Sequence, residues 1–96
     1  MFRSVENRCF QMTFTNGITV SMNVGACGYN DNHDSLNFIE RETKTRTVEV
    51  AVWNKNNKWI TKKFFPNADG GEVSVAGYVT MKEFQKALIK IINYRE

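Results

Sequence analysis

Residues 9–24, CFQMTFTNGITVSMNV, hold the feature that most constrains the fold, an Asn16-Gly17 pair between two alternating runs. Such a pair is the strongest short-range signal for a β-hairpin. A two-residue turn would split the apolar residues between the two faces of the sheet. A three-residue loop that ends in a left-handed Gly17 pairs Phe14 with Ile18, and this register puts all the apolar residues of the hairpin on one face. Because burial decides register, we predict the bulged hairpin.

A second hairpin is expected over residues 43–65, where valines alternate with other residues from 48 to 52. A three-residue loop that ends in a left-handed Asn57 sets Trp53 opposite Trp59 and turns the valine face toward the core. The two indoles then lie on the other face of the sheet, where they need a cover. The N-terminal segment or the long loop after the first hairpin is the favoured cover, and a second subunit or a ligand is the alternative.

The last third of the chain predicts a short strand at 72–76 and then a helix. Thr80 is suited to be the helix N-cap and Glu83 stands three residues later, which is a capping box. Apolar residues then recur at helical spacing: Phe84, Ala87, Leu88, Ile91 and Ile92. The expected fold class is α+β, an antiparallel sheet of four to five strands from two hairpins with one C-terminal helix on its apolar face. We expect a single domain over residues 1–96.

Charge and hydropathy exclude several classes of function. The net charge is +3, and the basic residues are interleaved with acidic ones rather than clustered, so nucleic acid is not an expected partner. No apolar run approaches the ~20 residues of a membrane helix, and the N-terminal MFRSVENRCF has no apolar secretory core. Two cysteines in a chain without a signal peptide indicate a cytoplasmic protein with free thiols.

Residues 25–34, GACGYNDNHD, fit neither a strand nor a helix. A thiol nucleophile at Cys27 with His33 as base would give a small hydrolase, but one loop preorganises such a pair poorly, so we expect no enzyme. A calcium loop fails because Leu36 stands where a sharp turn needs glycine. No metal and no cofactor are expected. A linker is the favoured interpretation, and the alternative is a binding loop that presents Tyr29, Asn30, Asn32 and His33.

Aromatic planes and cations together suit a nucleotide, because the base stacks on a ring and the phosphate pairs with a positive charge. Trp53 and Trp59 are the candidate rings outside the loop, and Arg46 and Lys62 are the candidate cations. With the four loop residues they form the predicted ligand-binding set.

The first hairpin, with the pattern F-x-M-T-F-x-N-G-x-T-V-S over residues 10–21, resembles a family of small proteins of tailed phages and prophages. The similarity continues through Trp53 and Trp59 to the Gly-Tyr-Val-Thr run at 77–80. The resemblance implies a phage accessory protein in the cytoplasm of the infected bacterial host. Such proteins commonly counter host immunity by binding.

The leading hypothesis is sequestration of a nucleotide immune signal. A chain of this size has little room to enclose a nucleotide, so the pocket is expected between subunits of a homo-oligomer. The alternative is a protein-protein inhibitor of a host defence enzyme, similar in action to an anti-CRISPR protein, that uses the outer sheet face or a strand edge. The expected partners are thus a nucleotide second messenger or a host defence protein, and no membrane.

Overall fold

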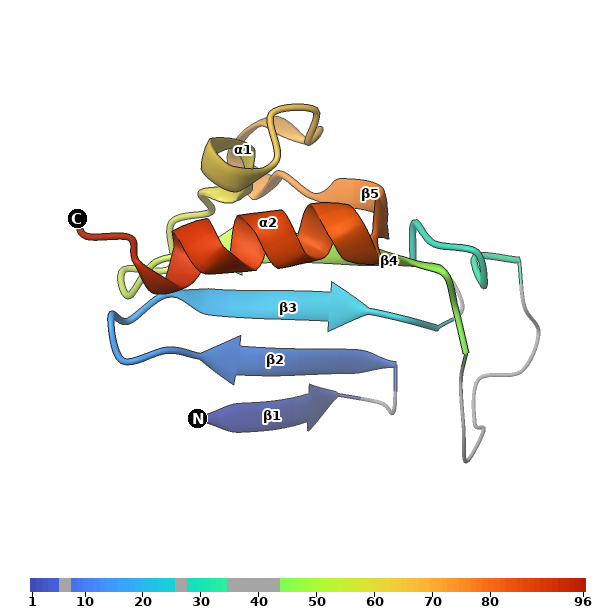
Figure 1. Ribbon diagram of the computed structural model, residues 1–96, viewed down its shortest axis with the longest axis horizontal. Coiled ribbons are helices and arrows are strands. Elements are labelled where there is room, and N and C mark those ends of the chain that lie inside the picture. Colours follow the sequence, from blue (N-terminus) through green and yellow to red (C-terminus); the bar gives the residue numbers. More distant parts are fainter. Residues whose placement is uncertain (6–7, 26–27, 35–43) are drawn as a thin grey trace.

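The computed structural model describes residues 1–5, 8–25, 28–34 and 44–96. The fold is α+β, as predicted, with five antiparallel strands in the order β1-β2-β3-β4-β5 and α2 on one face (Figure 1). The strands are β1 (Phe2–Val5), β2 (Cys9–Thr13), β3 (Thr19–Asn23), β4 (Thr47–Trp53) and β5 (Ala76–Thr80). The helices are α1 (Thr61–Phe64) and α2 (Met81–Ile92), with a 3-10 turn at Gly71–Val73. No helix of the described segments is long and apolar enough to cross a membrane.

The register of the first hairpin is confirmed. Gly17 is left-handed with φ +85°, and the Phe14 N–H donates to the Ile18 carbonyl over 2.9 Å. Met12 lies opposite Val20, so the apolar residues of β2 and β3 share one face. A Cβ on Gly17 would lie 3.2 Å from the Lys55 Cβ, so this turn contacts the turn of the second hairpin.

The turn of the second hairpin is also confirmed, but its return strand is not. Asn57 has φ +62°, and Trp53 pairs with Trp59. The chain then forms α1 at Thr61–Phe64, where the sequence predicted a strand to residue 65. The cause is Thr61, whose buried hydroxyl accepts the Val52 N–H at 3.0 Å and so ends the pairing with β4. The predicted start of this hairpin, Thr43, lies outside the described residues.

The strand predicted at 72–76 is wrong by about four residues. Gly70 and Gly71 have φ +112° and +60°, a conformation that belongs to turns rather than strands, and a 3-10 turn follows. β5 begins at Ala76, takes the place beside β4 and carries an irregularity opposite Val48–Val50. Tyr78 has φ +51° in this strand. Such local kinks are not encoded by an alternating pattern.

The capping box at the start of α2 is confirmed in both directions. The Glu83 N–H donates to Thr80 Oγ1 at 3.3 Å, and the Thr80 N–H donates to Glu83 Oε1 at 3.1 Å. Ala87 and Ile91 are buried on the sheet. Ile92, predicted in the buried stripe, is 49% exposed because it is turned about 100° around the helix from Ile91.

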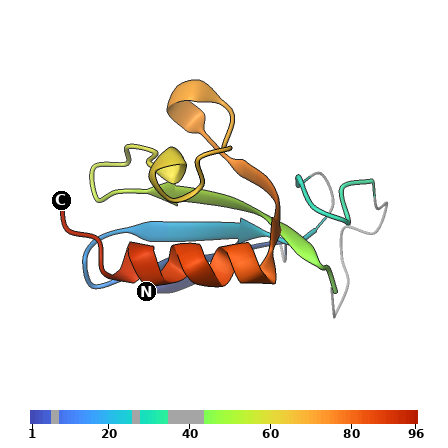
Figure 2. The ribbon, with the colours of Figure 1, turned by 45° about the horizontal axis from the view of Figure 1, so that its top comes forward.

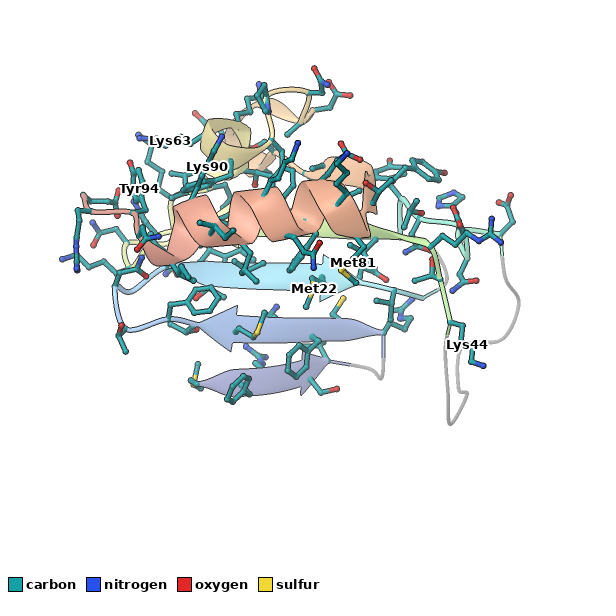
Figure 3. All side chains as sticks on the ribbon, in the orientation of Figure 1. Met22, Lys44, Lys63, Met81, Lys90 and Tyr94 are labelled. Carbon is teal, nitrogen blue, oxygen red and sulfur yellow. The ribbon has the colours of Figure 1, made fainter. Side chains whose placement is uncertain are left out.

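α2 covers β3 and β4, and the core lies between them (Figures 1 and 2). Its most buried members are Ile18, Val20, Val50, Val52 and Ile91. At the C-terminal end, Lys63 of α1 donates a 2.8 Å hydrogen bond to the Tyr94 hydroxyl, which raises the pKa of Lys63 (Figure 3). The segment that follows α2 is therefore tied to α1.

Among the elements that the structure describes, none covers the same face of the sheet over β1 and β2 (Figure 1). Phe2 is 75% exposed and stacks on Phe10 with the ring centroids 6.0 Å apart. Met81 and Ile92 lie on the same side of α2, because their spacing corresponds to nearly whole turns of the helix. On this side Met81 lies beside Met22 of β3 (Figure 3). We call Phe2, Phe10, Met81 and Ile92, all exposed, the apolar surface.

Candidate functional site

The face of the sheet opposite α2, here called the outer face, presents rows of directly paired residues. Side chains that are opposite each other in neighbouring strands point to the same side. The middle row is Arg3, Gln11, Ser21 and Ala51; beside it run the row Val5, Cys9, Asn23 and Glu49 and the row Thr13, Thr19, Trp53 and Trp59. The tryptophans therefore lie at the β4 side of this face and Arg3 at the β1 edge.

A cleft of about 220 Å³ opens on the outer face beside the two tryptophans. The indole centroids of Trp53 and Trp59 are 5.4 Å apart, and the ring planes are tilted by 31°. Both residues are half-buried. Val75, from the segment before β5, also lines the cleft. The predicted cover by the N-terminal segment is wrong, because that segment forms β1 at the far edge of the sheet.

Most polar groups of this cleft are uncharged. Gln11 and Ser21 lie in its middle, where the amide donates to the hydroxyl over 3.5 Å. Asn23 and Glu49 lie at one end, and Glu49 Oε2 accepts the Tyr29 N–H at 2.8 Å. Among the residues that line the cleft, within the described part of the chain, Glu49 is the only charged one. The cleft therefore suits a neutral planar group, and its Glu49 end repels anions.

Two of the predicted loop residues are used in folding the loop itself. Asn30 is 1% exposed and its amide donates to the carbonyls of Asn23 and Gly25 at 2.8 and 3.2 Å. The Asn32 amide donates to Val24 and Lys44 at 2.9 and 3.2 Å. These contacts make Asn30 and Asn32 structural residues of this segment.

Tyr29, which is exposed, and His33, which is half-buried, form an aromatic pair outside the cleft. Their rings are stacked with centroids 5.6 Å apart and an 11° tilt. His33 Nδ1 lies 2.9 Å from the Gly28 carbonyl, which can only accept, so this nitrogen carries the hydrogen. The Tyr29 carbonyl accepts the Tyr78 N–H at 2.7 Å. The described part of the loop is thus fixed to β4 and β5 by hydrogen bonds.

The two predicted cations do not meet the tryptophans. Arg46 is exposed beside a different cavity, on the helix side of the sheet, of about 390 Å³ and with Met22, Met81 and Phe84 among its lining residues. Lys62 is exposed on α1 and does not line the cleft. Arg46 lies in the bend before β4, on the helix side of the sheet, whereas Trp53 is the last residue of β4 and lines the cleft on the outer face.

No role was predicted for Gln11, Ser21 and Glu49, although all three lie on the outer face. Gln11 lies opposite Ser21 and Glu49 lies opposite Asn23, and this register was the signal that could have identified the cleft floor. Arg3 was missed because β1 was not predicted as a strand. Cys27, the candidate thiol, lies outside the described residues. Within the described segments, no three His, Cys, Asp or Glu side chains are grouped closely enough to hold a metal ion.

Comparisons of the chain with protein-family models, with curated proteins and with solved structures gave no match.

Proposed function

We propose that the protein is a non-enzymatic, phage-encoded accessory protein that counters host immunity by sequestering a nucleotide signal. One observation carries this proposal: the tilted pair of half-buried indoles, Trp53 and Trp59, in the outer-face cleft. Stacking on an aromatic side chain stabilises a bound base by about 1–3 kcal/mol. The amides and hydroxyl of Gln11, Ser21 and Asn23 supply hydrogen bonds for the polar edge of a base.

The setting of this proposal comes from the resemblance of the first hairpin to phage proteins, and its binding mode comes from the cleft. A cleft that is open on one side holds a small ligand only in part. The apolar surface supports association with a second copy of the chain, since exposed and stacked rings such as Phe2 and Phe10 are typical of interfaces. This surface lies on the helix side of the sheet, so a homo-oligomer formed through it leaves the outer-face cleft open and is a separate part of the proposal.

A protein-protein inhibitor of a host defence enzyme is the second candidate, and the edge of β1 favours it. Met1 and Thr13 exchange two backbone hydrogen bonds, of 3.0 and 2.8 Å. Residues of an antiparallel strand point their backbone N–H and C=O groups alternately toward and away from the neighbouring strand, so those of Phe2 and Ser4 point away from β2. No described strand pairs with this edge of β1, and an edge of this kind can accept a strand from another protein. In that case the apolar surface contacts a host protein rather than a second copy.

Calorimetry against a panel of cyclic dinucleotides and ADP-ribose derivatives tests the leading proposal. We expect one ligand per cleft, and a loss of affinity of about tenfold or more in Trp59→Ala because stacking contributes about 1–3 kcal/mol. Trp59→Phe is the matched control, because it keeps an aromatic ring and should retain most of the affinity. Circular dichroism checks that both variants are folded. No heat with any member of the panel would rule out the proposal.

A further inference from the structure

Charge is distributed unevenly across the outer face. The carboxylate of Glu49 lies at one end of the cleft, where its Oε2 is fixed by the Tyr29 N–H. Arg3 lies at the β1 edge, exposed and directly opposite Gln11, which itself lines the cleft. Because opposed residues point to one side of a sheet, the Arg3 side chain shares the outer face with the indoles.

The path from the tryptophans to Arg3 is polar and uncharged. In the middle row, Ser21 and Gln11 separate Ala51 of β4 from Arg3 of β1. Neighbouring strands are ~4.8 Å apart, so the Cα atoms of Ala51 and Arg3 lie about 14 Å apart. The long side chain of arginine extends over part of this distance. A ligand that spans this path needs a planar group at one end and an anion at the other.

We propose that Arg3 binds the phosphate of a nucleotide whose base stacks on Trp53 and Trp59, so that the ligand lies across the sheet from β4 toward β1. This inference rests on the proposed function. Glu49 repels a phosphate from its own end of the cleft, whereas a guanidinium offers several N–H donors that match phosphate oxygens. The ligand class is thus a nucleotide with an extended phosphate group, a nucleoside diphosphate or a derivative of one.

A matched pair of arginine variants isolates this role. Arg3 and Arg46 are both exposed, and each substitution by alanine removes one positive charge. Arg46 lies beside the cavity on the helix side of the sheet, so its charge is on the opposite face from the tryptophans. Arg46→Ala therefore reproduces the change in net charge without touching the outer face.

Titrations with ADP and adenosine, and with GDP and guanosine, distinguish phosphate from base recognition. We expect Arg3→Ala to weaken diphosphate binding about tenfold, to the affinity of the nucleoside, and to leave nucleoside binding unchanged. Arg46→Ala should change neither. Added salt should weaken diphosphate binding to the wild-type protein and to Arg46→Ala more than to Arg3→Ala.

Equal affinities of Arg3→Ala and Arg46→Ala for the diphosphate would overturn the assignment of Arg3. If binding then still depends on Trp59, the proposed function stands and only the orientation of the ligand is wrong. If the wild-type protein binds neither the diphosphates nor the nucleosides, nor any nucleotide of the calorimetric panel, the proposed function itself fails. The two failures therefore give different results.

Discussion

Thr61 occupies the point where the chain leaves the sheet after the second hairpin. Its hydroxyl accepts the Val52 N–H at 3.0 Å and donates to the Ser74 carbonyl at 2.7 Å, and the residue is fully buried. A side chain thus takes a hydrogen-bonding position that a continuing strand would have used. Threonine is common in strands, so the sequence ITKKFF predicted a strand here. The buried hydrogen bonds of Thr61 override this preference, and one of them needs the Ser74 carbonyl, thirteen residues further along the chain.

Thr61→Val tests this account of the turn. Valine has nearly the same shape but leaves the Val52 N–H and the Ser74 carbonyl without their buried partner. We expect the free energy of unfolding to fall by about 1–3 kcal/mol, the cost of unsatisfied buried polar groups. Denaturant titration measures it. Thr61→Ser keeps the hydroxyl and should lose less, so equal stabilities of Thr61→Val and the wild type would contradict the account.

Individual site residues were predictable where strand alternation decides their position. The facing of Trp53 and Trp59 followed from the turn, and it is confirmed. Asn30 was a different case, because the same amide that suits a ligand also satisfies two backbone carbonyls of its own loop. A sequence contains no information that separates these uses, since both need a polar side chain beside a turn.

At the scale of elements, local signals were sufficient for the first hairpin and for α2. The glycine turn and the alternation defined the register of β2 and β3, and the capping box defined the start of α2. β5 was misplaced because its position depends on the left-handed Gly70 and Gly71 and on the irregularity beside β4. β1 was not foreseen, because its four residues have an exposed edge and little apolar alternation.

The apolar surface beside the β1 edge predicts an oligomer. We expect light scattering to give twice the mass of one chain for the wild type and the mass of one chain for Phe2→Glu, because a charge at an interface of stacked rings opposes association. Val73→Glu is the matched control: Val73 is also exposed, at 58%, but it lies on the 3-10 turn away from this surface. A wild-type mass of one chain would instead favour the protein-protein inhibitor.

At the scale of the whole molecule, the two faces of one sheet serve different purposes. The helix side holds the core over β3 and β4, and the outer face carries the cleft, with tryptophans toward β4 and Arg3 at β1. α2 has twelve residues and lies along β3 and β4, so β1 and β2 keep an apolar face that it does not cover (Figure 1). The fold class was predictable from periodicity, whereas the cleft required the exact pairing of β2, β3 and β4.

Tryptophan fluorescence tests the central claim, base stacking in the outer-face cleft, most directly. The chain contains two tryptophans, Trp53 and Trp59, and both line this cleft, so their emission reports on it alone. A nucleotide bound between the indoles and the polar floor should change the emission saturably, with the midpoint found by calorimetry. If calorimetry registers bound nucleotide while the tryptophan emission stays unchanged, the ligand binds elsewhere and the claim is contradicted. An unchanged emission together with no heat of binding would contradict it as well.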